Sequence, residues 1–325
     1  MGGSSFSYAS RFAVALVLLL LFPSCGIVSR PDAPAERLLK RTIGLAAEVK
    51  EFGTTLGIEP TQALTQFSAT QAPLSMLWFW MQRVGTLALR APIDIRMAVG
   101  FSAAREQLKL EQVYRVDGYS VYYRQGNEFA DPRSAATVSF AEEGLLRRVK
   151  VILHEDLHGD KNFDLPWEIE ESIVTPLGSL AAVEFFKQKG DKANTELALA
   201  SIAEERLVAR ELNRLAAEAE KFFKTEPAEQ AKKSIVARLS AYPNYHRQFQ
   251  RQVEGQNSGT VLEAKLSHDL AYFRFFDAIA ALAEKVPNLR TLIEELQRLP
   301  ADASVDRLEK HIEYLHKKYH APAIF

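Results

Sequence analysis

The 325-residue chain has only one cysteine, Cys25. No disulfide can form within it, so packing and other contacts must stabilise the fold. An excess of charge of either sign is also missing, because 40 basic and 41 acidic side chains give a formal net charge of −1. A nucleic-acid-binding protein needs a strongly basic surface, so we expect no nucleic-acid partner. The remaining composition, 47% apolar and 25% charged, is that of an ordinary globular protein.

Long apolar runs are scarce as well. One lies near the N-terminus, from Phe12 to Phe22 after Arg11. It is well short of the about 20 residues that span a bilayer, and it is typical of the apolar segment of a secretory signal peptide. We therefore expect residues 1–24 to be a signal peptide, residues 25–36 a tether and residues 37–325 the folded domain.

The only cysteine directly follows this segment, in Phe22-Pro23-Ser24-Cys25-Gly26. The stretch resembles the lipobox of bacterial lipoproteins. The resemblance implies cleavage before Cys25 and lipid modification of that residue, which would anchor the protein in the cell envelope. Gly26 carries no acidic inner-membrane retention signal, which favours the outer membrane, facing the periplasm. The alternative is a plain secretory signal with an incidental cysteine.

The central motif of the sequence is His154-Glu155-Asp156-Leu157-His158. Apolar residues recur at helical spacing through it, so we predict a helix that Gly159 ends. Two histidines four residues apart lie on one face of a helix, and both imidazoles can bind one metal ion. Glu155 can then take a proton from a water on that metal, as in zinc hydrolases. The alternative is a chance H-E-x-x-H, with a probability on the order of 1 in 100 in such a chain.

A zinc site of this kind needs a third protein ligand, and the next predicted helix, which starts near Pro166, offers three acidic residues. Glu171 continues its apolar stripe, Glu168 shares that face one turn earlier, and Glu170 points about 100° away. Periodicity leaves the choice open, because Glu170 also borders the apolar face. At least two of the three are expected only to complement the dipole at the start of the helix.

The motif with a downstream helical glutamate resembles the gluzincin class of metallopeptidases. The segment Glu171-Ser172-Ile173-Val174-Thr175-Pro176-Leu177-Gly178 is similar to the N-E-S-F-A-T-x-x-G-like segment of a family of bacterial lipoproteins described as aminopeptidases. Glu170 stands where that family has asparagine. The resemblance implies that Glu171 is the third ligand and that a peptide is the substrate. The mixed imidazole and carboxylate set favours Zn²⁺ as the metal.

The predicted fold class is α+β, a predominantly helical zincin-like domain with a small antiparallel or mixed sheet before the H-E-x-x-H helix. Strand candidates are residues 74–89, which could equally form a core helix, a hairpin over 113–123 that turns at Asp117-Gly118, and residues 136–140. An exposed edge of such a sheet can bind an extended peptide. Helices are predicted over 35–56, 98–108, 193–224, 226–239, 261–283, 289–299 and 305–319.

Several other polar residues are candidates for supporting roles. A donor is needed for the oxyanion of a tetrahedral intermediate, and Tyr272, our choice as a catalytic residue, could supply it, as could His268, Tyr245 or His246. Asp160 is a candidate partner for a ligating histidine. His316 and His320 repeat the four-residue spacing, but without a neighbouring glutamate they are better explained as a solvated helix end.

These observations predict a lipid-anchored zinc metallopeptidase that binds the membrane through its anchor. Glu155 would be its general base. One alternative is a non-catalytic helical envelope lipoprotein that acts as a scaffold for a partner. Another is a metal-dependent hydrolase of non-peptide substrates. The name aminopeptidase rests on the family resemblance alone.

Overall fold

A computed structural model describes residues 33–68, 76–89, 94–99, 118–126 and 134–320. The predicted signal peptide and Cys25 lie outside these residues, and the first described helix begins at Ala33, inside the predicted tether. Among the described helices, none has the length and apolar character needed to cross a membrane.

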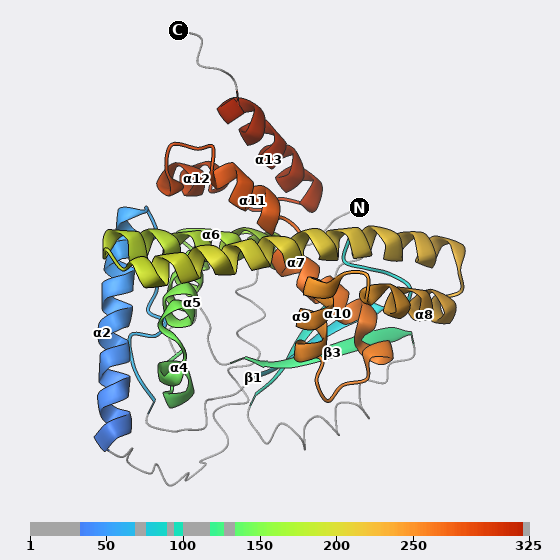
Figure 1. Cartoon of the computed structure of the whole chain (residues 1–325), viewed down its shortest axis with the longest axis horizontal. Helices are drawn as coiled ribbons and strands as arrows, with labels where there is room; N and C mark the ends of the chain where they lie inside the picture. Colours follow the sequence, from blue (N-terminus) through green and yellow to red (C-terminus); the bar gives the residue numbers. More distant parts are fainter. Residues whose placement is uncertain (1–32, 69–75, 90–93, 100–117, 127–133, 321–325) are drawn as a thin grey trace, which may run out of the picture.

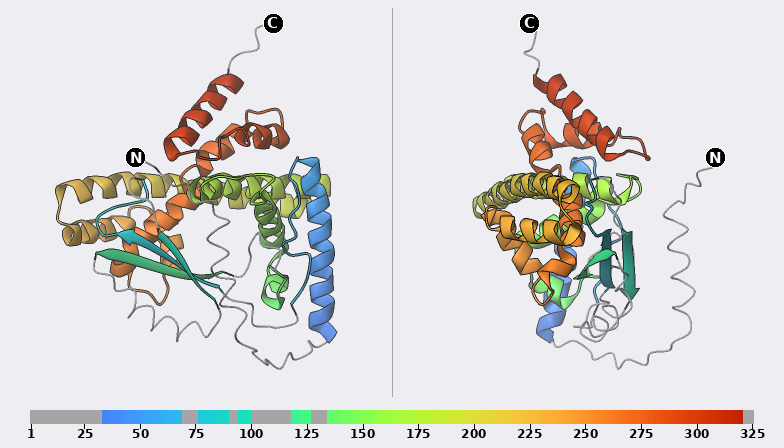
Figure 2. Two further views of the ribbon diagram at one scale, coloured as in Figure 1. Left: turned by 180° about the vertical axis from the view of Figure 1, so that it is seen from behind. Right: turned by 90° about the vertical axis from the view of Figure 1, so that its right-hand side faces the viewer.

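The described chain is mostly helical and carries one small antiparallel sheet, which confirms the α+β class. Two long helices, α6 (Trp167–Gln188) and α7 (Lys192–Thr225), pack side by side along the molecule (Figure 1). On one side of this pair lie α2 (Ala33–Thr55), α4 (Val138–Glu142) and α5 (Leu145–Leu157) at one end, with the sheet at the other. Figure 2 shows α11 (Phe276–Ala283), α12 (Leu289–Leu296) and α13 (Val305–His320) on the opposite side.

The sheet has three strands in the order β2-β1-β3. These are β1 (Met76–Arg83), β2 (Asp94–Val99) and β3 (Tyr119–Gly126), and both pairings are antiparallel. The helix α10 (Ser258–Phe273) packs against β1 and β3, and α8 (Ala228–Leu239) and α9 (Pro243–Gln252) lie beside it. Residues Trp80 and Tyr122, paired across the two strands, stack on each other and contact His268 of α10.

Two apolar cores share this framework. One lies among α2, α5, α6 and the C-terminal helices, and the other lies between the sheet and α7 to α10. They meet where α6 contacts α10. There the buried Ser172 hydroxyl donates a 2.7 Å hydrogen bond to the carbonyl oxygen of Ala271. Glu171 precedes Ser172 and Tyr272 follows Ala271 in the chain. The bond therefore fixes the position of Glu171 relative to Tyr272.

Most predicted elements are confirmed. The helix predicted over 35–56 is α2, and Gly57 follows it with a φ of 80°, a backbone conformation that glycine adopts at little cost. In the segment predicted over 74–89, the described residues 76–89 contain strand β1 and no helix. The second arm of the predicted hairpin is β3, which pairs with β1, and residues 113–117 lie outside the described part.

One predicted strand and the start of one predicted helix are wrong. Residues 136–140 form no strand, because Val138–Glu142 is the helix α4. The Thr137 hydroxyl accepts a 3.1 Å hydrogen bond from the Phe140 amide, so a capping threonine decides the conformation of this β-branched stretch. The helix predicted over 98–108 does not begin where expected, because Val99 ends β2; the rest of that segment lies outside the described residues.

The crossing of α5 and α6 depends on Gly178. A Cβ atom at this position would lie 3.2 Å from the Cβ of His154 and 3.3 Å from its Cα. We expect Gly178→Ala to lower the free energy of unfolding by about 1–3 kcal/mol through overpacking. Gly44, an exposed helical glycine with nothing within 4 Å of such a Cβ, is the matched control. Gly44→Ala is expected to raise the free energy by about 0.5–1 kcal/mol in the same urea titrations. Equal effects of the two substitutions would contradict the close approach at His154.

Candidate metal centre

Three side chains from two helices converge at the end of α5. His154 lies in the last turn of α5, His158 caps it and Glu171 lies in the second turn of α6. The Nε2 atoms of the two histidines are 3.1 Å apart, and Glu171 Oε2 is 3.5 Å from the first and 3.4 Å from the second. Two imidazoles and a carboxylate therefore point one ligand atom each at a common position, as a metal site requires.

The ligand atom of Glu171 is unusual in its surroundings. Its carboxyl group is buried, and Oε2 accepts no hydrogen bond from any residue that the structure describes. The other oxygen, Oε1, accepts a 3.2 Å hydrogen bond from the hydroxyl of Tyr272. Oε2 instead faces the two histidine nitrogens, so it is the oxygen that a cation bound here would share with them.

In the metal-free site, the pKa values of the three residues place one proton on His158, beside a neutral His154 and a charged Glu171. Burial lowers the pKa of His154 to about 3, and the charge of His158 adds to this effect. Burial acts in the same direction on His158, but Glu171 and Glu170 outweigh it and raise the pKa of His158 well above its usual value. Burial alone would raise the pKa of Glu171, yet the neighbouring His158 lowers it to about 2. A metal ion that binds here therefore replaces the proton of His158.

Glu170 holds the second histidine in place. Its Oε1 lies 2.6 Å from Nδ1 of His158, and its Oε2 accepts a 3.1 Å hydrogen bond from the Leu165 amide. A carboxylate on the outer nitrogen orients an imidazole and makes its other nitrogen a stronger ligand. We expected Asp160 in this role, but Asp160 is exposed. The prediction failed because the bend after Gly159 carries Asp160 outward and brings the start of α6 to His158.

Glu155, the predicted general base, lies close to the three-residue cluster. It follows His154 on α5 and is buried at 9% exposure. Its negative charge contributes to the raised pKa values of both His158 and Tyr272. The carboxylate is thus close to both His158 and Tyr272.

A buried ion pair that we did not predict from the sequence supports the end of α5. Asp156, inside the motif, pairs with Lys50 of α2. The same carboxylate oxygen accepts hydrogen bonds from the amide and hydroxyl of Thr61 at 3.0 and 2.8 Å. Asn162 donates a 2.7 Å bond to the Asp156 carbonyl oxygen. These contacts fix the last turn of α5 against α2 and the segment after it. Lys50 and Thr61 lie about a hundred residues from Asp156 in the chain, so local sequence could not indicate them.

Tyr272 is the predicted oxyanion donor that the structure brings to the cluster. Burial raises the pKa of its phenol well above the usual value, and the charge of Glu171 adds to the rise, so the hydroxyl stays protonated. The other candidates lie elsewhere. His268 packs on the Tyr272 ring but shares its Nδ1 with Asp269, and the Tyr245 hydroxyl also donates to Asp269. His246 lies on α9 with Tyr245. Of the predicted C-terminal histidine pair, the side chain of His320 is not described.

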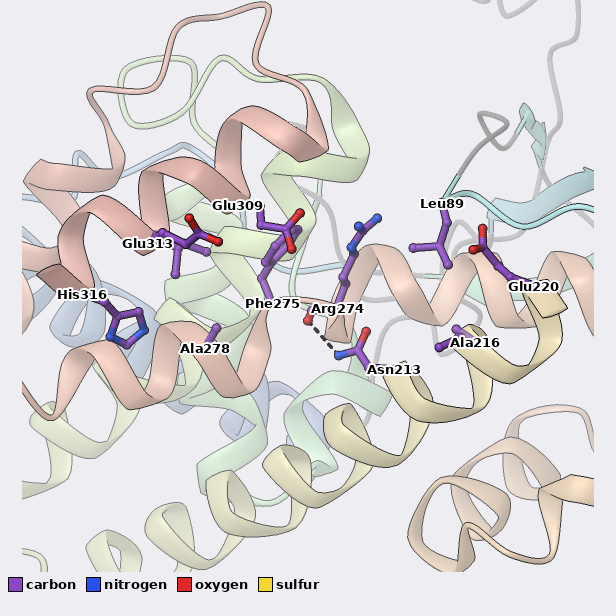
Figure 3. Close-up of a pocket in the computed structure, with 12 residues that line it drawn as sticks. Leu89, Asn213, Ala216, Glu220, Arg274, Phe275, Ala278, Glu309, Glu313 and His316 are labelled. Atoms are coloured by element: carbon purple, nitrogen blue, oxygen red, sulfur yellow. Dashed lines mark hydrogen bonds between the residues drawn. The ribbon is translucent and has the colours of Figure 1, made fainter.

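A separate hollow of about 650 Å³ lies between α7, the start of α11 and α13 (Figure 3). Arg274 reaches into it, and Asn213 donates to the Arg274 carbonyl oxygen. His316 also lines this hollow with Glu309 and Glu313. Arg274 follows Tyr272 by two residues, which places the two side chains about 200° apart around α10. The hollow is therefore on the other side of α10 from the metal cluster.

Comparison with known proteins gives no relative: no family model, no curated protein and no solved structure matches the chain. The functional argument therefore depends on the geometry of the site.

Proposed function

We propose that the protein is a zinc-dependent metallopeptidase in which His154, His158 and Glu171 hold the ion. The convergence of their three ligand atoms carries this proposal. Ligands about 2.0–2.1 Å from a tetrahedral zinc ion lie about 3.3 Å from one another. The observed separations of 3.1, 3.4 and 3.5 Å agree with that value.

The surrounding residues supply the remaining chemistry of peptide hydrolysis. Zinc bound at this position would lower the pKa of a water molecule and polarise the carbonyl group of the substrate. Glu155 would take the proton from the attacking water and deliver it to the leaving amine. The pKa of Tyr272 keeps its hydroxyl protonated, so the phenol can donate a hydrogen bond to the developing oxyanion.

Tyr272 also orients the third ligand. Its hydroxyl holds Oε1 of Glu171, which leaves Oε2 to face the two histidines. Substrate binding would compete for the same hydroxyl. We infer that the phenol moves from Glu171 to the oxyanion during the reaction, a short displacement for a group already beside the ligand.

The resemblance to lipoprotein aminopeptidases supports a peptide as the substrate, a zincin-like fold and a location in the cell envelope. Attachment there would be through a lipid on Cys25. The β3 edge of the sheet is partly covered by the Gln256 side chain. The Gln256 side chain donates to the Tyr123 carbonyl oxygen at 3.0 Å, so at this residue a bound peptide would have to displace Gln256 from β3.

The proposal is tested with the purified, zinc-supplied protein and two sets of substrates. We expect one zinc ion per chain and hydrolysis of unmodified peptides. Peptides with free and with blocked N-termini decide whether the enzyme is an aminopeptidase. Zinc binding with hydrolysis of esters alone would identify a hydrolase of non-peptide substrates, and absence of zinc would refute the proposal.

The contact between Glu170 and His158 predicts a measurable effect on metal affinity. Glu170→Gln removes the charge that orients and polarises the imidazole, and we expect the zinc affinity to fall about 10–100-fold. Competition with a chromophoric chelator measures this change. Glu168→Gln, one turn of α6 removed from Glu171, is the matched control and should leave the affinity unchanged. Equal losses in the two variants would show that the Glu170 contact has no special role.

A further inference from the structure

Arg124 lies on the face of the sheet that α10 covers. In β3 its side chain is on the same side as those of Tyr122 and Ser120, because alternate residues of a strand share a face. Both of these neighbours contact α10. Ser120 Oγ donates to the Thr260 carbonyl oxygen at 2.9 Å, and the Tyr122 ring lies 5.1 Å from the ring of His268.

These contacts show which turn of α10 lies level with Arg124. Ser120 contacts the turn from Thr260 to Ala264, and Tyr122 contacts Lys265 and His268, so β3 and α10 run in the same direction. Two strand residues advance about 6.7 Å, which equals the rise of four to five helical residues. Arg124 is two residues beyond Tyr122 in β3, so it lies level with the last turn of α10, which contains Tyr272.

The guanidinium of Arg124 is available for a ligand. It is exposed, and it makes no hydrogen bond or ion pair with any part of the chain that the structure describes. Burial raises the pKa of Tyr272 and lowers that of His268, and the charge of Arg124 opposes the first shift and adds to the second, in agreement with the position that the strand register gives it. Lys265, on the same side, is buried and already paired with Asp269.

The positive charge of Arg124 contrasts with the acidic residues around the metal centre. Glu155, Glu170 and Glu171 gather at the ends of α5 and α6, so a negatively charged substrate group would be repelled from that side. Beyond Tyr272, Arg124 offers a positive charge on the face of the sheet. A planar guanidinium binds a carboxylate through two parallel hydrogen bonds, with higher specificity than a lysine provides.

We propose that Arg124 binds a carboxylate group of the peptide substrate, which makes the enzyme selective for peptides that carry a carboxylate close to the bond that is cleaved. This inference rests on the proposed peptidase function and specifies its substrate class. The carboxylate is either the free C-terminus of a short peptide or an acidic side chain.

Three versions of one short peptide test the inference in the zinc-supplied, full-length protein. The first has a free C-terminus and neutral side chains, the second is its C-terminal amide, and the third is the amide with a glutamate beside the cleaved bond. We expect kcat/KM for one carboxylate peptide to exceed that of the plain amide by about 10–100-fold. Arg124→Gln should remove this preference, whereas Arg251→Gln, at an exposed arginine of α9, should keep it.

Measurements of peptide binding test this inference separately from the proposed reaction. The same peptides are titrated into the Glu155→Gln protein by calorimetry, with and without Arg124→Gln. A carboxylate preference that disappears with Arg124 supports the inference even if no peptide is hydrolysed, an outcome that would refute only the peptidase. Equal binding of the acid and amide peptides, or a preference that survives Arg124→Gln, overturns the inference even if hydrolysis is observed.

Discussion

Replacement of Glu155 by glutamine is expected to lower kcat for peptide hydrolysis by about 10²- to 10⁴-fold while zinc stays bound. Glutamine has nearly the same shape as glutamate but cannot accept a proton from water at neutral pH. The ligand atoms belong to His154, His158 and Glu171, so their positions do not depend on this carboxylate. Initial rates with a saturating peptide and zinc analysis of the same samples measure both parts of the prediction.

The matched control is Asp160→Asn, which removes a carboxylate two residues beyond the motif. Asp160 is exposed, so its loss should leave the rate and the zinc content unchanged. A Glu155→Gln protein that keeps zinc and hydrolyses peptides at a rate within a few-fold of the wild type would exclude Glu155 as the general base. Loss of zinc in that variant would instead indicate a structural role for Glu155.

Replacement of Glu171 by alanine has the second large expected effect, the loss of stable zinc binding. The variant lacks one of three protein ligands, and its affinity should fall further than the about 10–100-fold expected for Glu170→Gln. Chelator competition should therefore rank the affinities as wild type, then Glu170→Gln, then Glu171→Ala. An affinity of Glu171→Ala equal to that of the wild type would assign the third ligand elsewhere.

The same substitution changes the pH dependence of stability in the metal-free protein. The pKa of Glu171 is lowered to about 2 from an ordinary value of 4.5 because its partner His158 favours the charged carboxylate. A lowered pKa stabilises the folded state above the ordinary value, and this stabilisation is lost as the pH falls towards 2. Urea titrations should show a larger difference between wild type and Glu171→Ala at pH 7 than at pH 3. A difference that stays constant would contradict the charge pairing.

The motif and its helix could be predicted because local sequence determines both. Apolar spacing placed His154 and His158 on one face of a helix, and the stripe that contains Glu171 favoured the interior of the next one. The structure agrees with both expectations. Local periodicity could not fix the angle at which α5 and α6 meet. That angle depends on the close approach at Gly178 and on the bend after Gly159, and it decides that Glu170 contacts His158.

Other parts of the site depend on contacts between distant segments. Lys50 is buried against Asp156, although nothing in the sequence around either residue indicates a partner. Arg124 lies just beyond the predicted hairpin over 113–123, yet it belongs to β3 and lies on the face that α10 covers. A short stretch rich in β-branched residues became α4 because one threonine caps it. In each case a tertiary contact or a side-chain hydrogen bond outweighs the local preference.

The coordination of zinc is the most direct test of the central claim. X-ray absorption at the zinc edge of the loaded protein reports the number and type of ligands around the ion. We predict one zinc per chain, with two imidazole nitrogens and carboxylate or water oxygens at about 2.0–2.2 Å. Zinc that binds without imidazole ligands, or a spectrum unchanged by His158→Ala, would contradict a metal centre formed by His154, His158 and Glu171.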